Sequence, residues 1–387
     1  MSLTARRVLD LPPYMFAEID RVKRRMLDEG HKLLDFGVGD PDLPTPAFIV
    51  EAMIEAARLP RHHRYPGYAG MKSFRQAAAA WCERRHGIQA DPDREVLALI
   101  GSKEGISHLP LALVDPGDLV LVTDPGYPVY VNSIRFAGGE VALVPLAEEN
   151  GWLPDLDAID PALADRAKMM IVNYPNNPIG ATADRDFFER LIAWARKHDV
   201  FLMHDAAYIE VGYDGWRSPS LLALPGGKDI GIEFHSLSKT FNMTGWRVGY
   251  AIGNEVAIKA LATVKTQIDS GVFEPVQVAA TLAYQQGEAA LADILAVYQR
   301  RRDRMVPALR AMGLDAMSPR GAFYIWTRVP AGENSAGFAR RLLETAGVVV
   351  MPGTGFGARG EGWFRFSLTV PDAQIDELLA LLPKALG

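Results

Sequence analysis

The sequence predicts an α/β fold: a large domain with a mostly parallel seven-stranded sheet between helices, and a smaller α+β domain built from both chain ends. Through the middle of the chain, short segments rich in Val, Ile and Leu alternate with longer amphipathic segments. This alternation is typical of a parallel sheet that helices cover on both faces. After about residue 290 the pattern changes to that of a smaller α+β domain, and 387 residues are enough for about two domains.

Seven segments of the middle region have the apolar, β-branched composition of buried strands. They are residues 96–100, 119–122, 141–144, 169–173, 200–204, 232–235 and 248–252. Helices are predicted around and between them, at residues 71–85, 107–113 and 185–198. In sheets of this kind ligands bind beyond the carboxyl ends of the strands, so we expect the chemistry in the loops at those ends.

The region after residue 290 is predicted to contain both helices and strands. The helices are residues 290–312, 335–346 and a final one from Asp372, and the strand-like segments are residues 322–329, 348–351 and 363–368. We therefore expect a large domain at residues 46–290 and a small domain at residues 1–45 and 291–387.

Composition argues against several classes of partner. The net charge of −6 gives no reason to expect nucleic acid or an anionic membrane surface. Two basic clusters, at residues 21–25 and 300–304, are predicted to be solvated helix faces. A single cysteine, Cys82, excludes an internal disulfide and a thiol-based metal site, so we expect a cytoplasmic protein without a metal centre. No apolar run approaches the roughly 20 residues of a membrane span.

Three loops at predicted strand ends could each contact a ligand. In "GSKEGI" Gly101 allows a ligand to approach the backbone closely, and the amides of Ser102 and Lys103 lie at the start of a predicted helix. This arrangement suits a phosphate, although a plain strand-to-helix turn is an equal alternative. In "DPGYPVY" Tyr127 could stack on a planar ring or cover a turn. In "NYPNNPIG" Asn177 could present its amide to a ligand oxygen or belong to an ordinary Asn-Pro turn.

Two further stretches indicate ionised groups at strand ends. In "FLMHDAAYIE" Asp205 follows a buried strand, where a carboxylate is costly unless paired; a protonated ring nitrogen is one possible partner, and a helix N-cap is the alternative. Tyr208 follows by three residues and could flank the same site. In "HSLSKTFNMTGWRVGY" Lys239 follows another strand end. A lysine in a partly desolvated pocket loses its proton readily and forms Schiff bases, while Ser236 and Arg247 suit a phosphate.

As a set and in this order, these residues resemble the site of fold type I aminotransferases, which use pyridoxal phosphate and belong to the aspartate aminotransferase superfamily. The resemblance covers essentially all 387 residues. It implies that Lys239 forms the Schiff base and moves the substrate Cα proton, and that Asp205 keeps the pyridine nitrogen protonated. The other cofactor contacts that it implies are a stacking ring at Tyr127, a pair on the phenolic oxygen at Asn177 and Tyr208, and a phosphate cup at Ser102, Lys103, Ser236 and Arg247.

The same resemblance implies substrate contacts and a partner subunit. Arg365 in "WFRFSL" resembles the arginine that binds the substrate α-carboxylate, and Gly39 in "GVGDPDLPTP" the glycine whose amide contacts that group. Asn177 is expected beside the substrate as well. Tyr65 in "RYPGYAGMKSFR" resembles the tyrosine that reaches the phosphate in the partner subunit. A residue that crosses in this way requires a homodimer with symmetric sites at the interface.

The finer resemblance is to LL-diaminopimelate aminotransferases of lysine biosynthesis, through "GVGDPDLPTP", "FAGGE", "NYPNNP", "IEFHSLSKTFNMTGWRVGY", "VKTQIDSGVF" and "GEGWFRFSLT". One departure is "NPIGATAD", where that subgroup usually has a sequence closer to "NPTAAVA". The resemblance implies amino acid and 2-oxo acid substrates, with 2-oxoglutarate and glutamate as one pair. No single position explains how a distal group of the amino acid would be recognised.

Alternative functions differ in which of these residues they need. A donor such as aspartate, alanine or an aromatic amino acid would use the same Lys239, Asp205 and Arg365, and so would a C–S β-lyase on this fold. A non-catalytic regulator that senses the cofactor would be expected to have a DNA-binding segment, and the first 45 residues have no helix-turn-helix pattern. A nicotinamide oxidoreductase is disfavoured because no G-x-G-x-x-G follows the first strand.

Overall fold

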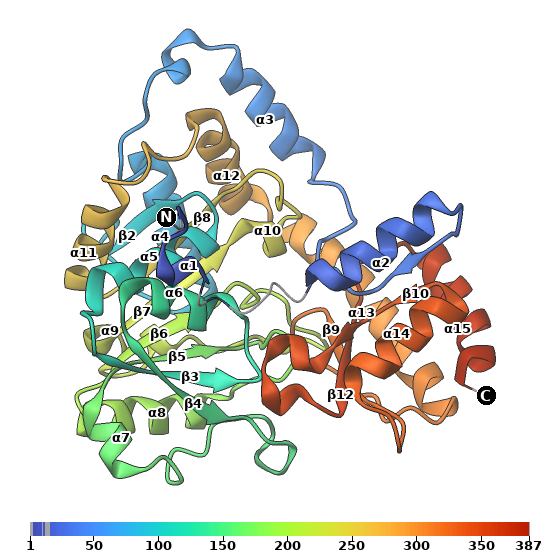
Figure 1. The fold of residues 1–387 in the computed structure, drawn as a ribbon. Helices are drawn as coiled ribbons and strands as arrows, with labels where there is room; N and C mark the ends of the chain where they lie inside the picture. The colour runs from blue at the N-terminus through green and yellow to red at the C-terminus, as the bar shows by residue number, and fades with distance from the viewer. Residues whose placement is uncertain (1–2, 10, 12–15, 387) are drawn as a thin grey trace.

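A computed structural model of the chain describes residues 3–9, 11 and 16–386. Its main feature is a seven-stranded sheet with the order β2-β8-β7-β6-β5-β3-β4 (Figure 1). Neighbouring strands are parallel except around β8, which is antiparallel to both β2 and β7. The predicted α/β class and its seven strands are confirmed. The strands are β2 (Val96–Leu99), β3 (Leu119–Asp124), β4 (Glu140–Pro145), β5 (Ala167–Asn173), β6 (Phe201–Asp205), β7 (Gly231–Ser236) and β8 (Gly249–Gly253).

The interior of this sheet is buried on both faces. On β3 the side chains of Val120 and Val122 belong to one hydrophobic cluster and that of Leu121 to another, so successive residues pack on opposite sides. Such strands need apolar residues at nearly every position, which explains the continuous Val, Ile and Leu segments. The helices of this region are α3 (Ala47–Ala57), α4 (Lys72–His86), α5 (Ser102–Leu113), α6 (Val129–Ala137), α7 (Pro161–Arg166), α8 (Arg185–Lys197), α9 (Gly227–Ile230), α10 (Leu237–Thr240), α11 (Glu255–Lys265) and α12 (Glu274–Gln286). Short 3-10 turns lie at η1 (Pro60–His63), η2 (Glu148–Asn150) and η3 (Leu221–Ala223).

Helix α5 begins at Ser102, earlier than the predicted segment 107–113. Its first turns contain Gly105, and glycine disfavours helix on local propensity alone. A Cβ at Gly105 would lie 2.5 Å from the ring of Phe234, so the glycine is required for the helix to approach the sheet. This close packing brings the N-terminus of α5 to the edge of the sheet where the parallel strands end.

The remaining elements lie mostly in a smaller part of the molecule beside the sheet, on the right in Figure 1. It contains a sheet of order β11-β12-β9, and β1 near the chain start pairs in parallel with β10 near its end. The predicted strand 348–351 is therefore two short strands in different sheets. The division of the chain into residues 46–290 and the two flanking segments stays a prediction. The elements are α1 (Arg6–Leu9), α2 (Phe16–Asp28), β1 (Leu34–Asp35), α13 (Glu288–Ala311), β9 (Tyr324–Arg328), α14 (Ser335–Ala346), β10 (Val348–Val349), β11 (Met351–Pro352), η4 (Gly353–Phe356), η5 (Ala358–Gly360), β12 (Trp363–Ser367) and α15 (Asp372–Leu386).

The basic cluster at residues 300–304 of α13 is not a solvated face throughout, contrary to the prediction. Arg301 is 2% exposed and Arg302 is 6% exposed. Arg301 donates two hydrogen bonds to the carboxylate of Asp42, at 2.7 and 2.9 Å, and Arg302 donates two to Asp214, at 2.7 and 3.0 Å. Because α13 is a long helix with neighbours on more than one side, two of its arginines are buried against carboxylates from distant segments.

No helix among residues 3–9, 11 and 16–386 is both long and apolar enough to cross a membrane.

We expect Asp42→Ala to lower the free energy of unfolding by about 3 kcal/mol, because it leaves the buried guanidinium of Arg301 without its bidentate partner. Denaturant unfolding followed by circular dichroism would measure the change. The matched control is Asp376→Ala, since Asp376 pairs with Arg304 on the surface. That control should cost less than about 1 kcal/mol. Equal losses in the two variants would contradict a special contribution from the buried pair.

Candidate active site

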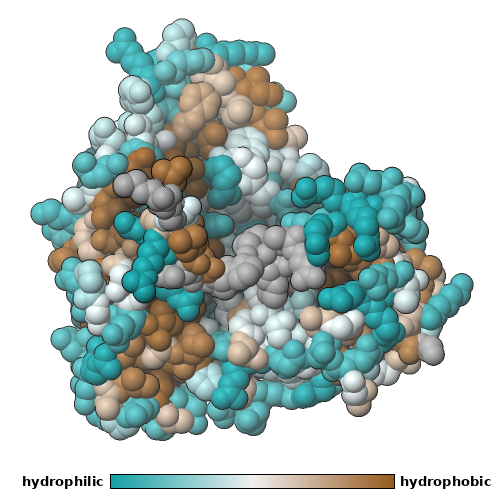
Figure 2. Space-filling model, viewed as in Figure 1, coloured by the Kyte–Doolittle hydropathy of each residue, from teal (hydrophilic) through white to brown (hydrophobic). Residues whose placement is uncertain are grey.

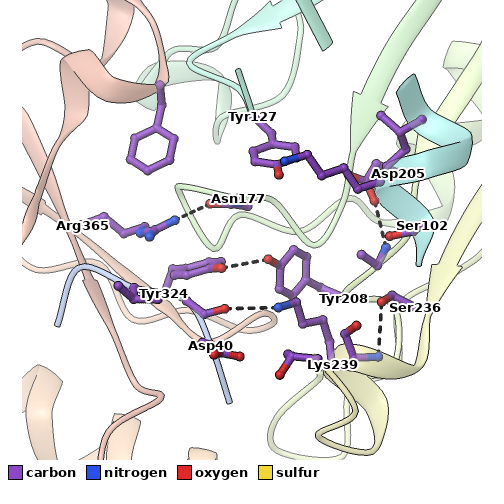
Figure 3. Close-up of a pocket in the computed structure, with 18 of the residues that line it drawn as sticks. Asp40, Ser102, Tyr127, Asn177, Asp205, Tyr208, Ser236, Lys239, Tyr324 and Arg365 are labelled. Carbon is purple, nitrogen blue, oxygen red and sulfur yellow. Dashed lines mark hydrogen bonds between the residues drawn. The ribbon is translucent and has the colours of Figure 1, made fainter. Parts of the chain in front are cut away.

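A cavity of about 510 Å³ lies where the parallel strands of the large sheet end (Figure 3). Arg365 and Tyr324 enter it from the small C-terminal sheet, opposite Ser102 and Asp205. Of the predicted site residues only Tyr65 lies elsewhere: it is 87% exposed on the surface. The predicted residues that line the cavity are Gly39, Ser102, Lys103, Tyr127, Asn177, Asp205, Tyr208, Ser236, Lys239, Arg247 and Arg365.

Lys239 is presented by the short helix α10, which follows β7 directly. The hydroxyl oxygen of Ser236 caps this helix by accepting a hydrogen bond from the amide of Ser238, at 3.3 Å. The amine of Lys239 donates to the backbone oxygen of Gly39, at 3.2 Å. Burial lowers the pKa of this amine to about 8; the negative charge of Asp40 opposes the shift. A substantial fraction of Lys239 is therefore neutral and nucleophilic near physiological pH.

Asp205 ends β6 and is buried. One carboxylate oxygen accepts a hydrogen bond from the hydroxyl of Tyr130 at 2.7 Å, and the other from the amide of Ala207 at 3.2 Å. Burial raises the pKa of Asp205, and these two donors act in the opposite direction. No helix begins directly after Asp205, since the next helical turn starts at Leu221, so the alternative of a helix N-cap is wrong. A buried carboxylate aimed into a cavity is suited to a cationic or protonated ligand atom.

The N-terminus of α5 and Arg247 together form a cradle for an anion. Gly101 caps α5 with φ +76°, and the first helical residues are Ser102 and Lys103. The positive φ favours glycine at 101, and without a Cβ the guanidinium of Arg247 can lie close to the helix end, since a Cβ would be 2.4 Å from its terminal nitrogen. Free amides at a helix N-terminus, a lysine and an arginine are the donors expected around a phosphate. A phosphate at this cradle stays a prediction, and "GSKEGI" is in either case the turn from β2 into α5.

Arg365 connects the small C-terminal sheet with the end of β5. It lies on β12, is 4% exposed, and donates to the side-chain oxygen of Asn177 and the backbone oxygen of Gly37, both at 2.6 Å. Its guanidinium lies over the rings of Tyr324 and Phe356, 4.2 and 4.8 Å from their centroids. Burial lowers the pKa of Arg365, and its Nε has no hydrogen-bond partner among the described residues. As a residue that lines the cavity, Arg365 is suited to a carboxylate ligand.

Comparisons with known proteins agree with this geometry. Residues 31–382 match the family model for aminotransferases of class I and II. The chain belongs to this family.

The aminotransferase is similar along its whole length to curated relatives. It is 51% identical over 381 residues to an LL-diaminopimelate aminotransferase of Nitratidesulfovibrio vulgaris, with 98% of both chains covered. It is 49% identical to the protein of that name from Desulforudis audaxviator, with 99% of this chain and 98% of the relative covered. Among solved structures, substrate-bound BacF from Bacillus subtilis has a TM-score of 0.96 at 37% identity, covering 99% of this chain and 98% of BacF. A double mutant of Thermus thermophilus aspartate aminotransferase has a TM-score of 0.94 at 32% identity and covers both chains fully.

Four residues of the aminotransferase site were not predicted from the sequence. The hydroxyls of Tyr324 and Tyr208 are hydrogen-bonded at 2.8 Å, and burial raises the pKa of both phenols. Tyr130 holds Asp205, and Phe356 and Asp40 also line the cavity. Tyr130 lies in the quoted stretch "DPGYPVY", three residues after Tyr127, which is a signal that helical periodicity could have used. No local pattern marks the others.

Among the residues that the structure describes, no group of three or more His, Cys, Asp and Glu side chains could hold a metal ion.

We expect chemical acylation of Lys239 in the cofactor-free protein to be half-maximal near pH 8, because only the neutral amine reacts and burial lowers its pKa to about 8. Mass spectrometry of the Lys239 peptide across a pH series would follow the reaction. Asp40→Asn is the informative comparison: removal of a carboxylate that stabilises the ammonium should move the midpoint to lower pH. A midpoint near 10.5, the ordinary value, would contradict the desolvated amine.

Proposed function

We propose that the protein is a pyridoxal-phosphate-dependent LL-diaminopimelate aminotransferase that uses 2-oxoglutarate as amino acceptor, in lysine biosynthesis. The observation that supports this most strongly is the identity of about half of all residues to curated LL-diaminopimelate aminotransferases over nearly the whole chain. A cytoplasmic location is part of the proposal, supported by the single, buried cysteine.

The residues present fit pyridoxal phosphate. The cradle at Gly101, Ser102, Lys103 and Arg247 suits its phosphate, and the hydroxyl of Ser236 lines the same cavity. Asp205 suits its ring nitrogen, and the aromatic ring of Tyr127 a planar heterocycle. Asn177 and Tyr208 would bond its phenolic oxygen. When bound, the cofactor supplies an aldehyde that takes up the amino group and a ring that accepts the electrons of the Cα–H bond.

In the proposed reaction the chain's own groups bind, orient and move protons. The amine of Lys239, with its pKa of about 8, can take the proton from the substrate Cα and return it. The hydrogen bonds from Tyr130 and Ala207 oppose the effect of burial and favour the carboxylate form of Asp205, which would hold a proton on the ring nitrogen. Arg365, which lines the cavity, would bind the α-carboxylate, with the Gly39 amide as a second donor.

Tyr65 is proposed to act in a homodimer. It is 87% exposed, and the loop it belongs to lies beside the segment near Gly271, since a Cβ there would be 3.2 Å from the backbone oxygen of Gly67. Two other large apolar side chains of these segments, Tyr68 and Ile268, are each 52% exposed. Hydrophobic residues also gather over the α3 region in Figure 2. An exposed apolar surface of this kind supports burial against a second copy of the chain, which would bring Tyr65 to the partner's site.

An amino-donor screen with 2-oxoglutarate would test the proposed reaction, with glutamate formation as the readout. LL-diaminopimelate should give the highest kcat/KM among donors that include aspartate, alanine and aromatic amino acids. Lys239→Ala should lose about 10³-fold in kcat and lose the visible absorbance of the bound cofactor. Lys228→Ala, a surface lysine paired with Glu95, is the matched control and should keep both. Pyruvate and ammonia from cystathionine, without transamination, would indicate a β-lyase instead.

Hybrid dimers would test whether Tyr65 acts across the interface. A Lys239→Ala protomer co-expressed with a Tyr65→Ala protomer should regain activity, because one of the two sites then combines an intact Lys239 with an intact Tyr65. Differently tagged subunits allow the hybrid to be purified and compared with both homodimers. Pairing Lys239→Ala with a protomer that has both substitutions should restore nothing. A hybrid no more active than the Tyr65→Ala homodimer would place Tyr65 in its own subunit's site, or in none.

A further inference from the structure

The proposed function leaves one part of the cavity for the substrate side chain. Ser102 and Asp205 lie on the side proposed for the cofactor, and Arg365 lies across from them (Figure 3). With the α-carboxylate at Arg365 and Cα at Lys239, the side chain has to run along the rest of the wall. The residues that line the cavity besides those assigned above include residues 38–40 and Asp20 of α2.

Two carboxylates of the cavity have no role in the proposed cofactor site. The cations Lys103, Lys239, Arg247 and Arg365, and the carboxylate of Asp205, are used by the cofactor or the α-carboxylate. Asp20 lies 3.9 Å from the amine of Lys23, a residue of its own helix. Asp40 is exposed at the cavity and has neither a hydrogen bond nor an ion pair within residues 3–9, 11 and 16–386.

A carboxylate without a partner on the wall of a substrate cavity is suited to a cation. LL-diaminopimelate has a second ammonium group at the far end of its chain, whereas glutamate, alanine and 2-aminopimelate have none. An ammonium bound to a carboxylate forms a charge-assisted hydrogen bond, which discriminates strongly against a ligand that lacks the donor. Building on the proposed function, we infer that Asp40 binds the distal ammonium of a diamino acid substrate and so selects it over monoamino acids.

Asp40 also has a second effect, which any test must separate from the first. Its backbone follows Gly39, whose oxygen accepts the hydrogen bond from Lys239, and its charge favours the protonated form of that amine. Replacing Asp40 therefore changes the reactivity of Lys239 towards every amino acid. A ratio of two substrates cancels this common effect, because both depend on the same lysine, and leaves the contribution of the distal group.

The test compares LL-diaminopimelate with 2-aminopimelate, which has the same length and the same distal carboxylate but no distal amine. Wild type and Asp40→Asn, both loaded with cofactor, are assayed for kcat/KM with each donor and 2-oxoglutarate. The ratio of the two values should favour LL-diaminopimelate in wild type and fall about tenfold or more in Asp40→Asn. Thermal unfolding and the visible absorbance of the bound cofactor would confirm that the variant is folded and loaded.

Asp20→Asn is the matched control, because it removes a carboxylate from the same cavity while Asp40 is kept. Its ratio should stay within about twofold of wild type, since Asp20 has Lys23 nearby. An unchanged ratio in Asp40→Asn, or an equal fall in both variants, would overturn the role of Asp40 while leaving the substrate in place. No turnover of LL-diaminopimelate by wild type would instead reject the substrate itself, and with it this role.

Discussion

The parallel pairing of β5, β6 and β7 is the constraint on which the site depends. Asn173 lies opposite Asp205, and Asp205 opposite Phe234, so the three strands end at one edge of the sheet. Residues that follow these ends, such as Asn177 and Lys239, are far apart in sequence and still line one cavity. Because the strands are buried on both faces, their register is strongly specified. The position at which each following loop begins is therefore fixed.

Burial of charge gives this cavity its chemical character. Burial shifts the pKa of Lys239 and Arg365 downward and that of Asp205 upward. Each of the three groups therefore favours its neutral form more than it would in water. Hydrogen bonds within the protein replace the lost solvation only in part: Tyr130 donates one to Asp205, and Arg365 donates one to Asn177. Asp205 and Arg365 both line the cavity, where a ligand could supply the remaining interactions. Binding and reactivity here therefore have the same origin, which is incomplete solvation of a few fixed groups.

Most of the large sheet could be predicted from the sequence, and so could a site formed by residues that follow its strand ends, because those ends converge in a parallel sheet. Gly39 and Arg365 were expected there only through the family resemblance, and all twelve proposed site residues except Tyr65 line the cavity. The side chains that contact those residues could not be predicted from the sequence. Tyr324 meets Tyr208, and Arg365 meets Asn177, across 116 and 188 positions of the chain. The arginines of α13 were misjudged for the same reason: Arg301 is buried by Asp42, 259 positions away, and nothing beside it in sequence indicates that contact.

The sequence by itself determined the succession of strands and helices and the types of reactive group at strand ends, because composition and turn residues act through near neighbours. Only the tertiary structure decided how those groups are solvated. The guanidinium of Arg247 lies against Gly101 although the two are far apart in sequence, and the amine of Lys239 is activated by burial rather than by its adjacent residues. Likewise, Asp40 is an ordinary loop aspartate until the fold sets it on the cavity wall, where it has neither a hydrogen bond nor an ion pair among the described residues and its charge acts on Lys239. Desolvation depends on everything packed around an atom, and that is a property of the folded chain alone.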